Sequence, residues 1–304
     1  KHALLLKLTN NNFQLKNNTI CDCINLDENE EKIPTIFIKI NSLEPLINLI
    51  FDEFVFRNNK YMQPIKQTTG FGGGIGLSIL TTKEKEQSFK LSFNNCIFAS
   101  NEATDNKHND NKNENLSGGA LYYVTNESIK MSSFSFTNCN FTKNYAQGKG
   151  GSLFIQTDYN CPIKISDCWF EINQAEIDGA AVYVRNEADL TIDSCYFINN
   201  SVSLTSESSS SLIPTDSLVV CACENVLIEN TMFIKLLFPG EESSVQTMFS
   251  IESQNLGKEV SINVKDSVYS IINPTKSVVA IRSQKTNGKS NIINVSFNHF
   301  YVLN

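Results

Sequence analysis

Paired carboxylates are the residues of this 304-residue sequence whose type and spacing could support catalysis. Glycoside hydrolysis needs two carboxyl groups, about 5–9 Å apart, that face one groove. The candidate pairs are Asp167 with Asp193 and Glu171 with Asp193. Asp167 and Asp193 differ by one position within the repeat described below, so we expect their side chains to point in different directions. We interpret these residues as solvated turn carboxylates and expect no catalytic site.

Thiols and imidazoles are the other groups that could bind a metal or act as nucleophiles. The segments Cys21–Cys23 and Cys221–Cys223 each place two thiols on one face of a strand, but two ligands are too few for a metal site. Buried or bridged cysteines are therefore expected there. The three histidines are His2, His108 and His299, and none is placed to pair with a Cys or Ser inside the repeats. We expect no metal and no cofactor.

Composition excludes several classes of protein. Hydrophobic residues make up 41% of the chain, which is too many for a wholly disordered protein. The formal net charge is −7 and only three residues are Arg, which argues against nucleic-acid binding. No run of about 18 apolar residues is present, so we expect membrane attachment only through segments outside this chain. Six Asn-x-Ser/Thr sequons occur, at Asn17, Asn115, Asn126, Asn140, Asn199 and Asn294. Chance alone predicts about that many, so their number does not indicate secretion.

An internal repeat organises the sequence. Each unit opens with a pair of small residues and an alternating apolar run, and it closes with an aromatic residue followed three positions later by Asn. The clear copies open at Gly72, Gly118, Gly150 and Gly179. Weaker copies lie on both sides of them, and the closing aromatics follow one another at intervals of 27 to 43 residues. A repeat of this length is typical of a solenoid or a similar array.

The repeat unit predicts short strands. Segments such as 121–124 are rich in β-branched and aromatic residues, and segments such as 190–192 alternate with period two. A unit this small cannot bury its apolar face alone, but it can when it stacks on its neighbours. The sequence therefore predicts an all-β parallel solenoid of about nine coils that repeat every ~4.8 Å. A β-sandwich is less favoured because Asn287-Gly288 is the one Asn-Gly hairpin signal.

Three sets of recurring residues are expected to form structural ladders. The inward aromatic column is Phe98, Phe141, Phe170 and Phe197. Two residues earlier, on the same inner side, are the small side chains Cys96, Cys139, Cys168 and Cys195. We interpret these as buried thiols, with bridges between coils as the alternative, because Thr231 and Ser267 occupy the equivalent places. The Asn ladder at a bend is Asn101, Asn144, Asn173 and Asn200.

Residues 1–304 are expected to form a single β-helix domain. The strongest repeats span 72–200, and degenerate coils span 1–71 and 201–304. The polar segments 102–117 and 203–211 are expected to be loop insertions that project into solvent, where a binding surface would be sought.

The pairing of Gly-Gly-Ala-apolar with Phe-x-x-Asn resembles the polymorphic outer membrane protein repeat. The copy that opens at Gly118 and closes with Phe141 and Asn144 matches this pattern best. Gly179-Ala180 departs from it at the second Gly, and Phe233 lacks the following Asn. The resemblance implies a right-handed parallel β-helix of the pectin-lyase type, display at the cell surface, and adhesion.

Three functions stay open on the sequence alone. The first is an extracellular, surface-displayed β-helix that binds other proteins or surface glycans without catalysis. The second is a structural solenoid that self-assembles into a coat or filament. The third is a carbohydrate-active enzyme, a lyase or glycosidase, which would need two carboxylates within a groove.

Overall fold

The computed structural model describes most of the chain as β-strands and the bends between them. The described residues are 4–8, 12–21, 24–26, 36–40, 46–63, 75–81, 88–105, 116–124, 130–157, 161–186, 189–203, 215–221, 223–235, 247–253, 259–271, 279–283, 292–299 and 301–303. They form 33 strands and no helix. No described segment forms a helix long and apolar enough to cross a membrane.

Two nine-stranded sheets hold the longer strands. Sheet 1 comprises β1 (Leu4–Leu8), β5 (Ile36–Ile40), β9 (Ile75–Thr81), β13 (Leu121–Val124), β17 (Leu153–Thr157), β21 (Val182–Asn186), β25 (Thr215–Cys221), β28 (Thr247–Ser253) and β31 (Val279–Ser283). Sheet 2 comprises β2 (Asn12–Lys16), β6 (Leu46–Asp52), β10 (Ser88–Asn94), β14 (Lys130–Thr137), β18 (Ile163–Ser166), β22 (Leu190–Asp193), β26 (Asn225–Glu229), β29 (Glu259–Lys265) and β32 (Ile292–Asn298).

Shorter strands form the other two sheets. Sheet 3 comprises β3 (Thr19–Cys21), β7 (Val55–Arg57), β11 (Ile97–Ala99), β15 (Asn140–Thr142), β19 (Trp169–Glu171), β23 (Tyr196–Ile198), β27 (Met232–Lys235), β30 (Val268–Ile271) and β33 (Tyr301–Leu303). Sheet 4 comprises β4 (Ile24–Leu26), β8 (Lys60–Gln63), β12 (Glu102–Asp105), β16 (Tyr145–Ala146), β20 (Gln174–Ala175) and β24 (Ser201–Val202).

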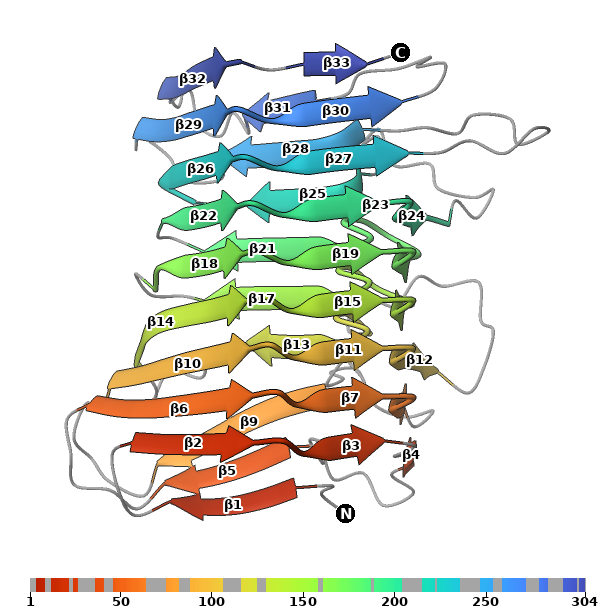
Figure 1. The fold of residues 1–304 in the computed structure, drawn as a ribbon, viewed down its shortest axis with the longest axis vertical. Helices are drawn as coiled ribbons and strands as arrows, with labels where there is room; N and C mark the ends of the chain where they lie inside the picture. The colour runs from red at the N-terminus through yellow and green to blue at the C-terminus, as the bar shows by residue number, and fades with distance from the viewer. Residues whose placement is uncertain are drawn as a thin grey trace.

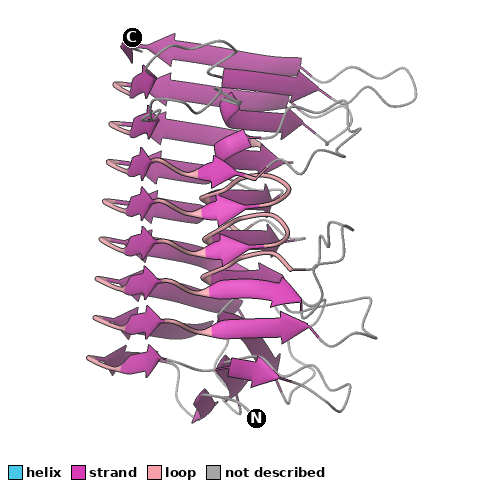
Figure 2. Ribbon diagram, turned by 90° about the vertical axis from the view of Figure 1, so that its right-hand side faces the viewer, coloured by secondary structure: helices cyan, strands magenta, loops and turns pink. Residues whose placement is uncertain are grey.

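Successive coils stack in parallel along the long axis of the molecule (Figures 1 and 2). Each coil takes one strand from each of sheets 1 to 3, and the first six coils add a strand of sheet 4. Every strand pairs with its equivalent in the next coil, as β15 does with β19 through Phe141 and Phe170. The chain rises with a right-handed turn (Figure 1). The predicted right-handed parallel β-helix of about nine coils is thus confirmed.

The bend between sheets 2 and 3 has the same form in all nine coils. One residue adopts the left-handed conformation, with φ between 48° and 57°, and the chain then enters the next strand after one more residue. The left-handed residues are Asn17, Glu53, Asn95, Asn138, Asp167, Ser194, Asn230, Asp266 and His299. Asn and Asp tolerate this conformation better than most residues, which explains their frequency there.

The paired glycines allow the chain to enter sheet 1. Gly118 and Gly150 have φ values of 70° and 66°, which side chains with a Cβ rarely adopt. At the second position, a Cβ on Gly151 would lie 2.1 Å from the carbonyl oxygen of Ala180. The glycine pair therefore serves both a left-handed turn and close contact between coils.

The interior is a continuous core in which aromatic rings stack from coil to coil. The Phe column of sheet 3 comprises Phe56, Phe98, Phe141, Phe170, Phe197 and Phe233, all 0% exposed, and ends at the buried ring of Tyr269. Neighbouring ring centroids lie 4.6–4.9 Å apart, which matches the spacing of hydrogen-bonded strands. Burial of one such ring stabilises the fold by about 1.5–3 kcal/mol, so cohesion runs along the axis.

The predicted insertion 102–117 needs a correction at both ends. Residues Glu102–Asp105 form β12 in sheet 4, paired with β8 and β16. Leu116 and Ser117 are fully buried. Both ends belong to the coil, because the first pairs with neighbouring strands and the second packs in the interior, although most of the insertion is polar. Residues 106–115 of this insertion and 204–211 of the other lie outside the described residues.

Candidate functional site

The predicted Asn residues form a buried, hydrogen-bonded ladder at the bend between sheets 3 and 4. The side-chain oxygen of Asn173 accepts hydrogen bonds from the backbone and side-chain nitrogens of Asn144, both at 3.0 Å. Its side-chain nitrogen donates to Asn200 and to the carbonyl oxygen of Phe141. Asn59 occupies the same position one coil before Asn101. Its signal in the sequence is Phe56, three residues earlier.

The small residues of the other bend are buried hydrogen-bonding groups. The Cys168 thiol lies 3.2 Å from the carbonyl oxygen of Ser166, two residues earlier. Thr231 and Ser267 make the same contact with their hydroxyl groups. The four predicted thiols, Cys96, Cys139, Cys168 and Cys195, form no disulfide bond. Burial raises the pKa of Cys161 to about 12, so this thiol stays protonated at neutral pH. The ladders are therefore structural, and a binding surface must be sought outside the core.

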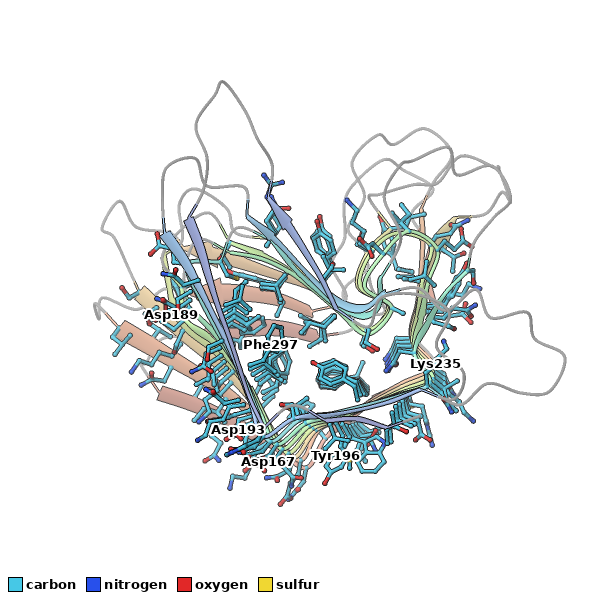
Figure 3. The ribbon with its side chains drawn as sticks, turned by 90° about the horizontal axis from the view of Figure 1, so that it is seen from above. Asp167, Asp189, Asp193, Tyr196, Lys235 and Phe297 are labelled. Atoms are coloured by element: carbon cyan, nitrogen blue, oxygen red, sulfur yellow. The ribbon has the colours of Figure 1, made fainter. Side chains whose placement is uncertain are left out.

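Exposed apolar side chains gather on the outer face of sheet 3. Each short strand points its middle residue inward and its first residue outward, because side chains alternate along a strand. The first residues stack in register and are called here the outer ladder: Val55, Ile97, Asn140, Trp169, Tyr196, Met232 and Val268. Ile97, Trp169 and Tyr196 are 43%, 38% and 39% exposed. Viewed along the axis, Tyr196 projects away from the core (Figure 3).

Trp169 and Tyr196 form the centre of this surface. Their ring centroids lie 4.6 Å apart with an interplanar angle of 27°, so the rings stack along the axis of the solenoid. The ring faces therefore turn toward neighbouring coils and the ring edges toward solvent. These edges carry the indole N–H and the phenol hydroxyl, which can form hydrogen bonds with a partner.

Ile172 adds a strained apolar side chain at the next bend, three residues after Trp169. It is the left-handed residue of the bend after β19, with φ of 53°, and it is 46% exposed. The equivalent residues in other coils are Asn58, Ser100, Lys143 and Asn199. A β-branched residue in this conformation is an outlier that costs about 1–2 kcal/mol, and exposure returns no packing energy. Strain of this kind without a structural benefit is typical of functional surfaces.

Six large hydrophobic residues are exposed in the part of the chain that the structure describes, and they fall into two groups. Ile97, Trp169, Ile172 and Tyr196 lie on sheet 3 or at its bend. Val295 and Phe297 belong to β32, the outermost strand of sheet 2, and pair with the inward residues Ile262 and Val264. The first group is the stronger candidate because it lies on the side of the solenoid and points away from the core.

The candidate catalytic carboxylates occupy different positions in the coil. Asp167 is an exposed left-handed bend residue, whereas Asp193 ends β22 in register with Ser166. Asp193 accepts hydrogen bonds from the Ser194 hydroxyl and the Asn230 amide. Glu171 lies in β19, within a different sheet. The register difference expected between Asp167 and Asp193 is therefore present.

Metal-ligating side chains do not cluster among the described residues. No group of three or more His, Cys, Asp or Glu side chains there could hold a metal ion. His299 pairs with Asp266 through its Nδ1 atom at 2.9 Å. His2, His108 and Cys23 lie outside the described residues.

Comparison of the chain with models of protein families gave no match. Comparisons with curated protein sequences and with solved structures gave no match either. The resemblance to the polymorphic outer membrane protein repeat therefore stays a prediction from the sequence, and the fold stands on the structure alone.

Proposed function

We propose that the chain is a non-catalytic binding protein, displayed at the cell surface, whose outer ladder contacts a partner in adhesion. The observation that supports this most directly is the stacked, exposed pair Trp169 and Tyr196, with the strained and exposed Ile172 at the bend that follows β19. Exposed apolar clusters on a stable fold mark interaction sites, and Trp and Tyr dominate the energy of such contacts.

The chemistry of the surface fits a partner with apolar groups and hydrogen-bond acceptors. The ring edges offer apolar contact and two donors, while Thr142 and Glu171 lie on the same outward face at the third position of their strands. Both a protein surface and a surface glycan have this combination of groups. The sheet is rigid, so little conformational entropy is lost when a partner binds.

Binding is tested with beads coated with the 304-residue chain, applied to cultured cells and to an array of immobilised glycans. The double variant Trp169→Ser/Tyr196→Ser should lose adhesion by roughly 30-fold or more, as expected for the loss of one to two aromatic hot spots. The matched control is Lys164→Ser/Thr191→Ser, which changes outward residues of the same two coils on sheet 2. Equal adhesion of the double variant and the wild type would refute the outer ladder as the binding surface.

Surface display is tested separately in the source organism. An antibody against the chain should label intact, non-permeabilised cells, and protease added outside should remove the signal. Labelling only after permeabilisation would refute display. The two alternative functions, assembly into a coat or filament and carbohydrate-active catalysis, gain no specific support from the part of the chain that the structure describes.

A further inference from the structure

Asn140 interrupts the outer ladder. Every other described position from Val55 to Val268 carries an apolar side chain, whereas Asn140 is polar, short and exposed. Asn140 and Tyr196 are the register partners of Trp169 on its two sides. Tyr196 stacks on one face of the indole, so the other face turns toward the level of Asn140. An asparagine side chain is too small to cover that face, which leaves a gap one coil high.

The gap coincides with an N-glycosylation sequon. Asn140 is followed by Phe141 and Thr142, the pattern that an oligosaccharide acceptor requires. Phe141 points into the core, so Asn140 and Thr142 share the outward face of β15. The Thr142 hydroxyl donates a hydrogen bond to the side-chain oxygen of Asn140. The side-chain nitrogen of Asn140, the atom that would bear the sugar, donates no hydrogen bond to the described residues.

The other sequons among the described residues lack this environment. Asn17 is an exposed bend residue with φ of 51°, and its sequon leads into β3 in the first coil. Asn199 is a bend residue next to the buried Asn200, and Asn294 lies in the last coil. Asn115 and Asn126 lie outside the described residues. Asn140 is thus the described acceptor that has an aromatic face in the next rung.

We propose that Asn140 is an N-glycosylation site whose first N-acetylglucosamine packs on the free face of Trp169. This rests on the proposed surface display, because the oligosaccharide is added in the secretory pathway. The donor is a lipid pyrophosphate-linked oligosaccharide. The Asn140 side-chain nitrogen forms a bond to C1 of the sugar and loses one proton, while the bond between C1 and the pyrophosphate oxygen breaks and lipid pyrophosphate leaves.

The dimensions of the ladder suit a sugar ring at this position. Adjacent rungs lie ~4.8 Å apart, the distance between paired strands, and the Trp169 and Tyr196 ring centroids are 4.6 Å apart. A pyranose ring at the level of Asn140 would therefore meet the indole at stacking distance. Its C–H groups carry partial positive charge and the indole face carries the negative part of the ring quadrupole, so the contact is attractive. The attached sugar completes the ladder and restricts partner binding to the side of Tyr196 and Met232.

The experiment uses the 304-residue chain secreted from cultured eukaryotic cells. Peptide mass spectrometry after peptide:N-glycosidase F treatment in heavy-oxygen water reports occupancy at each sequon. Trp169 is the one tryptophan of the chain, so its fluorescence reports the packing directly. Asn140 should be occupied, and a glycan trimmed to one sugar by endoglycosidase H should roughly halve acrylamide quenching, because both indole faces are then covered.

Sequon variants test attachment of the glycan separately from its packing on Trp169. Asn140→Gln and Thr142→Val should each lose the glycan and restore quenching, and Asn140→Asp is the control for the residue that the glycosidase leaves. Occupancy of Asn17 with an unoccupied Asn140 would overturn the proposal, as would a glycan at Asn140 that leaves Trp169 quenching unchanged. Neither result bears on surface display, because the host cell supplies the donor. Permeabilisation-dependent labelling in the source organism would instead refute display.

Discussion

The inner and outer faces of sheet 3 obey different rules although they come from the same short strands. In β11, β15, β19, β23 and β27 the inward residue is Phe every time, and each ring is 0% exposed. One position earlier, the outward residue is Ile, Asn, Trp, Tyr or Met in turn. The inward residue is the same in each of these strands because the stacking of coils depends on it. The outward residue differs between strands because stacking does not constrain it. A repeat protein can thus change its binding surface without changing its core.

The two bends of sheet 3 extend this contrast. In most coils the left-handed residue at each bend precedes a buried residue, and hydrogen bonds to a neighbouring coil hold that buried residue, as at Asn144 and Cys139. Most of the left-handed residues are Asn, Asp, Ser or other polar types, but Ile172 is not. The departure lies three residues after Trp169, on the outer side, where the other observations place the candidate surface. Ile172 is thus both strained and exposed at a position where the other described coils carry a polar residue.

The strongest test of the contrast compares neighbouring residues in β19. Phe170→Ala should lower the free energy of unfolding by about 3–5 kcal/mol, because it leaves a cavity between Phe141 and Phe197. Trp169→Ala should change it by less than about 1 kcal/mol, because the indole is partly exposed. Urea unfolding followed by circular dichroism measures both. Similar losses for the two variants would break the distinction between faces.

A second test removes one rung of the Asn ladder. Asn173→Ala removes the acceptor of the Asn144 backbone nitrogen and one of the two acceptors of the Asn144 side-chain nitrogen, all in the interior. It also removes the side-chain hydrogen bonds that Asn173 donates to the Phe141 carbonyl and to Asn200, although the Asn200 oxygen keeps the bond from the Asn173 backbone nitrogen. Buried polar groups without partners cost about 1–3 kcal/mol each, so we expect a loss of about 2–4 kcal/mol in total. The control is Asn138→Ala at the exposed left-handed bend, where water replaces the lost contact. A larger loss at Asn138 would show that backbone conformation, and not the ladder, sets stability.

Much of the fold could be predicted because the residues that define the repeat are the ones that stack between coils. Phe170 and Asn173 recur at fixed offsets, and each needs an equivalent in the next coil, so period and interior follow from the sequence. The sequence does not predict sheet 4, because a strand such as Tyr145–Ala146 has two residues and no detectable alternation. The hydrogen bonds of the Cys residues do not follow from the small size of the thiol, although Thr231 and Ser267 at the equivalent positions indicate a donor.

The candidate surface has a signal in the sequence. Trp169 and Tyr196 each stand between the Cys and the Phe of a copy, so period two places both outward and the repeat places them in adjacent coils. Asn59 likewise follows Phe56 by three residues. What the sequence cannot supply is the strain at Ile172, because the left-handed conformation of that position is visible only in the structure.

Ile172 offers a smaller effect with the opposite sign. Ile172→Asn should raise the free energy of unfolding by about 1 kcal/mol, because Asn tolerates a φ of 53° and no buried contact is lost. The same variant should weaken adhesion of coated beads, because it removes exposed apolar surface at the bend that follows β19. Asn199→Ile, the reverse change one coil later, should lower stability by a similar amount. A destabilised Ile172→Asn variant would show that this side chain contributes to packing instead of binding.

The smallest expected effect concerns the pH dependence of stability at Asp52, at the end of β6. The hydrogen bond from Asn95, first, and then the contact with Lys16 lower the pKa of this carboxyl below its ordinary value of 3.8. The folded state thus binds a proton less readily than the unfolded state, so the contribution is complete above pH 3.8 and is lost as pH falls through the folded pKa. Urea unfolding between neutral and acidic pH should show a shallower decline in the free energy of unfolding for Asp52→Asn than for the wild type.

Two further variants separate the contacts of Asp52. Asn95→Ala should remove more of the pH dependence than Lys16→Met, because Lys16 is largely exposed and its charge is screened by salt. The opposite order would mean that exposed ion pairs, and not the hydrogen bonds between coils, govern the outer bends.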